Sequence, residues 1–238
     1  MKIGLASYEF RNNDIAFNLG QIERGIKEVG KEVDLLCFGE AFLQGFNSLS
    51  WDFDVDKTVA VSQDSAAIRS LCDYSRKYEI DLIVGYIELA ANNIFSSCAV
   101  IEDGRLTHNY RRISRGWKEF WKTDDHYKEG EDVVKFLYKG NLITLALCGD
   151  LWDYPEKFRT EGLLIWPVYV NLEVTEWRQA EERAYAHQAA LVANRTFMVD
   201  SFCRISEPNG VAGTFYFENG LISKRTEYGI EDILIIDM

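Results

Sequence analysis

The sequence has few prolines, few histidines and few positive charges. Three of its 238 residues are proline and three are histidine, and 26 lysines and arginines stand against 38 acids, for a formal charge of −12. A nucleic-acid backbone or an anionic membrane surface needs clustered cations, so we expect neither as a partner. No apolar run approaches the roughly 18 residues that span a bilayer. No low-complexity stretch offers a linker, so we expect a single domain over residues 1–238.

Cysteine is also sparse, and its distribution argues against two kinds of site. The five cysteines are odd in number and widely scattered, and none belongs to a Cys-x-x-Cys pair. A disulfide framework and a zinc site are therefore unsupported, and the histidines share no metal-binding spacing. This usage indicates a reducing compartment, so we expect a cytoplasmic protein without a metal. Most of the cysteines are expected to be small buried apolar residues, but one can be a nucleophile.

The sequence does contain a regular alternation of short apolar runs and amphipathic stretches. The first third predicts strands over 2–8, 34–38 and 81–86, with helices over 14–30 and 62–78 between them. Asp14 stands where the first helix would have its N-cap. This β-α-β-α-β order predicts helices packed on a sheet, with right-handed crossovers wherever the strands run parallel.

The middle of the chain predicts hairpins instead. An Asp-Gly turn separates the apolar runs 94–101 and 106–113, and a second turn separates 133–137 from 142–147. Because these pairs add antiparallel strands to a fold that begins with parallel ones, we expect mixed sheets.

Strand–helix alternation then returns. The predicted elements are a short helix near 155–161, a strand at 163–166, a long helix at 175–194 and a strand at 196–202. The long helix is expected to bury Trp177, Ala180, Ala184, Ala190 and Leu191. We expect three last strands, at 213–217, 221–224 and 232–237, to form one small antiparallel group, with an Asn-Gly hairpin turn at Asn219 and Gly220.

The end of the strand at 34–38 carries the first candidate for chemistry. Glu40 follows this apolar run after one glycine, Gly39, and is itself followed by Ala-Phe-Leu. Open α/β sheets bind ligands just past the ends of their strands, and a carboxylate among apolar neighbours can act as a general base. A solvated loop glutamate is the competing interpretation.

The second candidate lies at the end of the strand at 142–147. Cys148 is followed by Gly149, where a helix is expected to open. This is the strand–turn–helix order of a nucleophile elbow, in which the N–H after the nucleophile faces a developing oxyanion. A helix N-terminus is expected to lower the pKa of the thiol. A structural cysteine at a strand end is the alternative.

The third candidate is a cation at the end of the strand at 106–113. Arg111 and Arg112 follow Tyr110, and a cation there could complement an oxyanion or a substrate carboxylate. Two arginines on an exposed strand end are the alternative.

Together these segments resemble the nitrilase superfamily of carbon–nitrogen hydrolases. DLLCFGEAFLQGF resembles the glutamate motif of that family, LITLALCGDLWDYPE its cysteine motif, GRLTHNYRRIS the strand that carries its lysine, and GTFYFENGLI its late hairpin. The resemblance extends along the whole chain. It implies an α/β fold, a four-layer α-β-β-α sandwich of two mixed sheets flanked by helices.

The chain departs from the family pattern at the lysine. The family's lysine falls on Arg112, and its usual histidine two residues later falls on Ser114. Arginine is larger than lysine and presents a planar fork rather than a point charge. Three interpretations stay open: Arg112 replaces the lysine, Lys118 or Lys122 from the loop GWKEFWK supplies the cation, or the site is impaired.

Two further features of the family pattern are less clear. The second glutamate of the family has no clean match, and Glu119 and Asp124 are the candidates. Aromatic residues in the loops after the strand ends, Trp152 among them, suggest a closed pocket, for which ordinary packing is the alternative. Lys118 is a candidate for binding a substrate carboxylate, with an exposed basic loop as the alternative.

The resemblance implies hydrolysis of a non-peptide C–N bond in a small amide or N-carbamoyl compound, without a metal or organic cofactor. Cys148 would be the nucleophile and Glu40 its base, while Arg112 and the N–H of Gly149 would hold the oxyanion. Because proteins of this family commonly pair through helices beside the active-site sheet, the resemblance implies a homodimer or higher homo-oligomer. We expect it to form through the helix at 175–194 and the helix after Cys148. The alternatives are an impaired binding or scaffold protein, or a cysteine–histidine hydrolase with a histidine beside Cys148.

Overall fold

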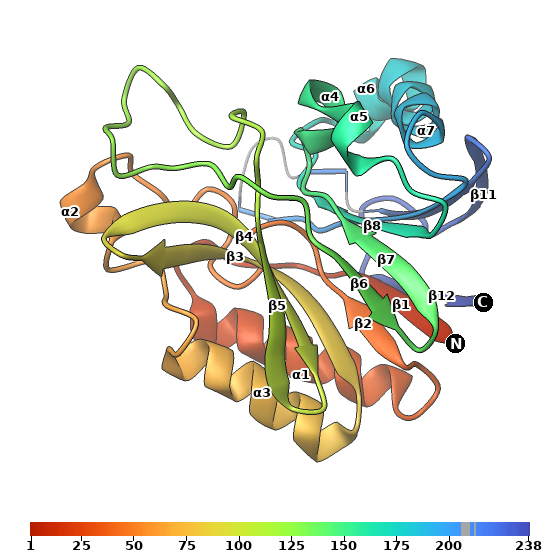
Figure 1. Cartoon of the computed structure of the whole chain (residues 1–238), viewed down its shortest axis with the longest axis horizontal. Helices are drawn as coiled ribbons and strands as arrows, with labels where there is room; N and C mark the ends of the chain where they lie inside the picture. Colours follow the sequence, from red (N-terminus) through yellow and green to blue (C-terminus); the bar gives the residue numbers. More distant parts are fainter. Residues whose placement is uncertain (206–209, 212) are drawn as a thin grey trace.

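Two six-stranded mixed sheets form the centre of the molecule, and helices cover the outer face of each (Figure 1). The computed structural model describes residues 1–205, 210–211 and 213–238. The strand orders are β12-β1-β2-β3-β4-β5 and β11-β10-β9-β8-β7-β6. The strands are β1 (Lys2–Ser7), β2 (Leu35–Cys37), β3 (Asp81–Ala90), β4 (Asn93–Glu102), β5 (Arg105–Arg111), β6 (Lys135–Tyr138), β7 (Asn141–Leu145), β8 (Leu163–Val168), β9 (Arg195–Asp200), β10 (Thr214–Glu218), β11 (Leu221–Arg225) and β12 (Asp232–Asp237). The helices are α1 (Ile15–Val29), α2 (Phe53–Asp56), α3 (Ala66–Tyr78), α4 (Asp150–Asp153), α5 (Pro155–Phe158), α6 (Val174–Glu176), the π-helix η1 (Trp177–Glu181) and α7 (Glu182–Ala190).

The predicted opening of the fold is confirmed. Strands β1, β2 and β3 run parallel, and α1 and α3 cover the face of the first sheet that is turned away from the second. Asp14 caps α1 by accepting the N–H of Phe17 at 2.9 Å. Helix α3 begins at Ala66 rather than at residue 62, because Ser65 supplies its N-cap. The short helix α2 was not predicted, since four residues are too few to show a helical period.

The Asp-Gly and Asn-Gly turns are also confirmed. Asp103 and Gly104 have φ values of 49° and 70°, and Asn219 and Gly220 have 50° and 77°. Two successive left-handed residues match the twist of the flanking strands, and Asp-Gly and Asn-Gly adopt this conformation at low cost.

The predicted closing group of three strands is wrong for the last of them. Strand β12 leaves β10 and β11 and pairs antiparallel with β1 in the other sheet. Its side chains explain this placement, because Ile236 is buried between the sheets while Ile233 and Ile235 pack in the cluster that lies under α1 and α3. Such a strand is apolar on both faces and needs a sheet that is covered on both sides.

The inner face predicted for the helix at 175–194 is also partly wrong. Trp177 is buried as expected, but Ala180, Ala190 and Leu191 are exposed. The five residues of η1 form a π-helix, which inserts residues into the helical repeat and rotates the positions that follow it. Ala186 and Ala189 therefore take the buried positions.

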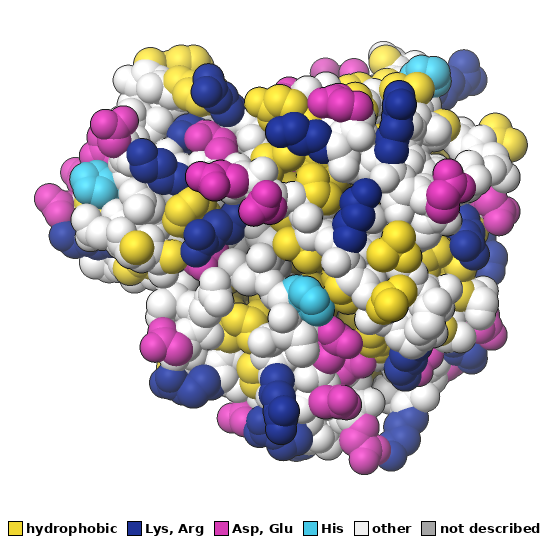
Figure 2. Space-filling view, viewed as in Figure 1, with side chains coloured by type: hydrophobic (Ala, Val, Ile, Leu, Met, Phe, Trp, Pro, Cys, Tyr) yellow, Lys and Arg dark blue, Asp and Glu magenta, His cyan; other side chains and the backbone are white. Residues whose placement is uncertain are grey.

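The largest apolar cluster fills the space between the sheets and extends under the helices of the second sheet. The inward-facing positions of the first sheet are apolar over most of their length, with polar side chains at one end. Ser96 and Arg112 are buried there, beside the ends of β2 and β7. On the outside, Figure 2 shows basic side chains interspersed with acidic ones on the face that it presents.

Candidate active site

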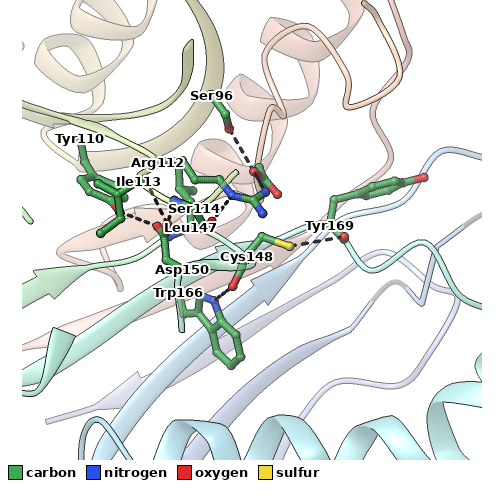
Figure 3. A network of polar contacts seen from close by, with 11 residues as sticks. Ser96, Tyr110, Arg112, Ile113, Ser114, Leu147, Cys148, Asp150, Trp166 and Tyr169 are labelled. Carbon is green, nitrogen blue, oxygen red and sulfur yellow. Dashed lines mark hydrogen bonds and ion pairs between the residues drawn. The ribbon is translucent and has the colours of Figure 1, made fainter. Parts of the chain in front are cut away.

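Cys148 lies in the turn between β7 and α4, in a left-handed backbone conformation with φ of 39°. Its N–H donates to the carbonyl of Pro167 at 3.0 Å, and its own carbonyl accepts from Nε1 of Trp166 at 2.9 Å. Strand β8 therefore holds both backbone polar groups of Cys148. The half-buried thiol points to the carbonyl oxygen of Tyr169 at 4.0 Å (Figure 3).

Glu40 lies in the loop after β2 and is completely buried, which excludes the solvated loop glutamate. Its N–H donates to the carbonyl of Val168 at 3.2 Å, at the end of β8. Its Oε1 accepts from Oγ of Ser96 at 3.0 Å and from Nη1 of Arg112 at 2.8 Å. Its Oε2 is buried too, but no described residue donates a hydrogen bond to it. One oxygen is thus fixed, and the other is available to accept a proton.

Arg112 follows the end of β5, and only 3% of its side chain is exposed. Besides the bond to Glu40, its Nε donates to Oγ of Ser114 at 2.7 Å (Figure 3). Burial alone lowers the pKa of this guanidinium, but the charges of Glu40, Cys148 and Asp150 outweigh it and raise the pKa above its ordinary value. Arg112 is therefore a permanent cation inside the protein.

The carboxylate of Asp150 links the elements that carry Cys148 and Arg112. It accepts the N–H groups of Leu147 at 2.8 Å, Ser114 at 2.8 Å and Ile113 at 3.1 Å, and also the hydroxyl of Tyr110 (Figure 3). Burial raises the pKa of Asp150, although the charge of Arg112 and these hydrogen bonds oppose the rise.

The expectation of a lowered thiol pKa is wrong. Burial raises the pKa of Cys148 to about 12, and the negative charge of Glu40 acts in the same direction, with Arg112 opposing both. Helix α4 has four residues, too few for its end to offset the burial. At neutral pH the resting group is a neutral thiol, so a base must remove its proton when it attacks.

Glu40, Arg112 and the Cys148–Gly149 turn come together, whereas the other predicted residues contact different partners. Lys118 forms an ion pair with Glu129 at 2.7 Å, and Glu119 forms one with Lys122 at 2.9 Å. Trp152 is 41% exposed and contacts Tyr185 edge-on, with ring centroids 5.2 Å apart. No hydrogen bond or ion pair within the described residues joins Lys118, Glu119 or Trp152 to the Glu40–Arg112 pair.

The histidines do not supply a catalytic partner for Cys148 either. His108 stacks on Phe136 and His126 on Phe53, and His187 is exposed on α7.

Within the described part of the chain, no group of three His, Cys, Asp or Glu residues is arranged to hold a metal ion. No helix in that part is long and apolar enough to cross a membrane.

Sequence reasoning missed Ser96, and gave Ser114 and Asp150 no role. Ser96 alternates along β4 with Cys98 and Val100, which are buried and apolar. A hydroxyl on the buried apolar face of a strand is a signal that could have identified it, because buried polar groups are kept where they have a partner. The role of Asp150 depends on contacts with a distant segment, and that of Ser114 on a side-chain bond to Arg112, two residues away.

The chain matches the family model for carbon-nitrogen hydrolase over residues 2–221. The chain therefore belongs to the carbon-nitrogen hydrolase family. It is 22% identical over 160 residues to an (R)-stereoselective amidase of Pseudomonas sp., an alignment that covers 67% of this chain and 55% of that protein. The chain thus spans little more than half the length of this relative.

Solved structures share the fold at low sequence identity. A variant of the amidase from Nesterenkonia sp. AN1, which shows Michael addition of acrylamide at its active-site cysteine, superposes with a TM-score of 0.77 at 17% identity, covering 100% of this chain and 93% of that one. A CN-hydrolase superfamily protein from Xanthomonas campestris with an arsenic adduct in its active site gives a TM-score of 0.79 at 15% identity, covering 99% and 89% of the two chains. The expected nitrilase-like fold is confirmed.

Proposed function

We propose that this protein hydrolyses the C–N bond of a small amide or N-carbamoyl compound through a thioester on Cys148. The observation that carries the proposal is the buried Glu40–Arg112 pair beside a cysteine in a strained turn. Family membership and the likeness to amidases support the same reaction class.

In the proposed reaction, Oε2 of Glu40 accepts the thiol proton while the sulfur of Cys148 attacks the carbonyl carbon. The carbonyl oxygen becomes an oxyanion, which the guanidinium of Arg112 and the N–H of Gly149 stabilise. Glu40 then returns its proton to the nitrogen, and the C–N bond breaks to release ammonia or an amine. Glu40 next removes a proton from water, which attacks the thioester, and the thiol regains its proton as the acid leaves.

Arg112 is assigned as the cation because it contacts Glu40 directly, whereas Lys118 and Lys122 are paired with other acids. This assignment places an arginine where the family pattern has a lysine. A guanidinium is suited to the role because it stays charged at every working pH and can hold Glu40 with one nitrogen while another faces the substrate.

The test is mass spectrometry of the protein incubated with acrylamide, followed by assays with small amides, nitriles and N-carbamoyl compounds. We expect an adduct on Cys148, no adduct at that position in Cys148→Ser, and ammonia release by the native chain alone. Cys72 is the internal control, because it is also half-buried but lies in α3 on the outer face of the first sheet. Labelling spread evenly between Cys72 and Cys148 would count against the nucleophile.

The main alternative is a protein that binds the same class of compound without converting it. It would show ligand-dependent thermal stabilisation but neither a Cys148 adduct nor ammonia release.

Because members of the family commonly form oligomers, we also propose a homo-oligomer formed through α4 to α7, where Trp152 and Leu191 are exposed. Light scattering after size-exclusion chromatography tests this, and a monomer would contradict it.

A further inference from the structure

The three nitrogens of the Arg112 guanidinium have different surroundings. Nε donates to Ser114 at 2.7 Å and Nη1 to Glu40 at 2.8 Å. Nη2 forms no hydrogen bond with any described residue, and it lies against the backbone of Gly149 and Gly116. Two nitrogens therefore fix the plane of the guanidinium. The third, Nη2, is held beside the cysteine turn, where its N–H groups can donate to a substrate.

Gly149 is needed at this turn for space rather than for backbone conformation. Its φ of −65° and ψ of −8° are helical values that any residue adopts. A Cβ at this position, however, would lie 2.4 Å from Nη2 of Arg112 and 3.3 Å from Oγ of Ser114. The end of a free arginine could move aside, but this one is buried and bonded to Ser114 and Glu40. A Cβ on Gly149 would displace it from both.

We propose that Ser114 and Gly149 are positioning residues that fit this site to an arginine. Ser114 sets the plane of the guanidinium, and Gly149 leaves the space in which Nη2 meets the carbonyl oxygen of the substrate. This inference rests on the proposed function and specifies which nitrogen of Arg112 faces the oxyanion. The hydroxyl of Ser114 and the missing side chain of Gly149 act only through Arg112, whereas the N–H of Gly149 keeps its separate role as an oxyanion donor.

A lysine at position 112 would not fill the same site. Its side chain ends one bond before Nη2 and has no group equivalent to Nε, so the bond to Ser114 and the contact with Gly149 would both be lost. Substituting lysine would leave the volume beside Gly149 empty. An alanine at position 149 should therefore be harmful next to arginine and harmless next to lysine.

The experiment is a double-mutant cycle read by the rate of acrylamide addition to Cys148 at one fixed pH. Since the charge of Arg112 lowers the thiol pKa, moving the guanidinium away should slow the addition. We expect Gly149→Ala to slow it about tenfold in the native background and less than about twofold in Arg112→Lys. Ser114→Ala should show the same dependence on the background, and amide turnover should follow both. The control is Gly20→Ala in α1, where a Cβ would meet nothing within 4 Å.

Equal slowing by Gly149→Ala in both backgrounds would overturn the inference, because the glycine would then serve the turn and not the arginine. No slowing in the native background would overturn it as well. Thiol alkylation does not require turnover, so the two proposals can fail separately. Coupling without ammonia release from any amide contradicts the proposed function, whereas ammonia release without coupling contradicts only the role of Ser114 and Gly149.

Discussion

The N–H of Ser114 donates to the carboxylate of Asp150 across 2.8 Å and so ties the segment that carries Arg112 to the turn that carries Cys148. The two segments are 36 residues apart in the chain. The same carboxylate also accepts the N–H of Leu147, on the other side of the cysteine. One buried side chain thus fixes the distance between the cation and the nucleophile.

Asp150→Ala should destabilise the protein strongly and disorganise the site. Each buried N–H left without an acceptor costs about 1–3 kcal/mol, so a loss of at least about 3 kcal/mol is expected. Urea unfolding measures the loss, and the rate of Cys148 alkylation reports on the site. Asp153→Ala is the matched control, because Asp153 lies in the same helix with its side chain exposed. Equal stability of the two variants would refute the linking role of Asp150.

The pH dependence of alkylation should reflect the raised pKa of Cys148. In the native protein the rate should keep rising above pH 9, toward the thiol pKa of about 12. Glu40→Gln removes a negative charge that raises this pKa, so it should shift the profile to lower pH while abolishing turnover. Glu119→Gln is the control and should leave the profile in place. If Glu40→Gln leaves the pH profile unchanged, the charge of Glu40 does not influence the pKa of the Cys148 thiol.

Two alanine variants should distinguish Arg112 from Lys122 as the cation of the site. Arg112→Ala should reduce turnover about 10²–10³-fold, the typical cost of removing one oxyanion donor. Lys122→Ala should stay within about twofold of the native rate, since that side chain is half exposed and paired with Glu119. Steady-state kinetics with a single amide suffices. A native rate in Arg112→Ala would transfer the role to another group.

Stability in acid should depend on Glu88, a fully buried carboxylate on the opposite face of the first sheet from the site. Burial raises its pKa, but hydrogen bonds from Arg111, Gln63, Ser97 and Asn109 outweigh it and lower the pKa below its ordinary value. A lowered folded-state pKa gives stability above the unfolded value of 4.5 that is lost as the pH falls through the folded value.

Thermal melts of the native chain and Glu88→Gln should therefore converge as the pH is lowered from 7 below 4.5. The native chain should be the more stable of the two at neutral pH, because the glutamine leaves Arg111 without its bidentate partner. Glu161→Gln, an exposed position, should melt with the native chain at every pH. A constant gap between the native chain and Glu88→Gln across the whole range would show that Glu88 does not titrate there.

Most of the fold could be predicted from the sequence, because the spacing of apolar residues along a strand or helix is a local signal. The apolar runs and the Asp-Gly and Asn-Gly turns predicted the strands and hairpins. The partner of β12 could not be predicted, since its continuous apolar run at 233–236 indicates two covered faces but not which strand lies beside it. The π-helix η1 was likewise hidden, because one shifted turn leaves the apolar composition of the segment unchanged.

The site could be predicted in part for the same reason. Glu40 and Cys148 stand at the ends of apolar strands, and this position marked them as candidates. The bond from Ser96 to Glu40 joins residues 56 apart in the chain and depends on how the strand ends meet in space. The bond from Arg112 to Ser114 spans only two residues, but it depends on both side chains turning to the same side of the chain. The direction of the thiol pKa was mispredicted because burial and the charge of Glu40 come from distant segments.

The left-handed backbone at Cys148 implies that the conformation presenting the thiol lowers the stability of the folded protein. A side chain at φ of 39° costs roughly 1–2 kcal/mol, and glycine would remove most of that cost. Cys148→Gly should therefore melt at a temperature no lower than Cys148→Ala, although glycine weakens most other positions of a fold. If so, the fold tolerates an unfavourable backbone conformation at the position where it presents its proposed nucleophile. Inactive variants with glycine at position 148 would then be at least as stable to heat as those with alanine.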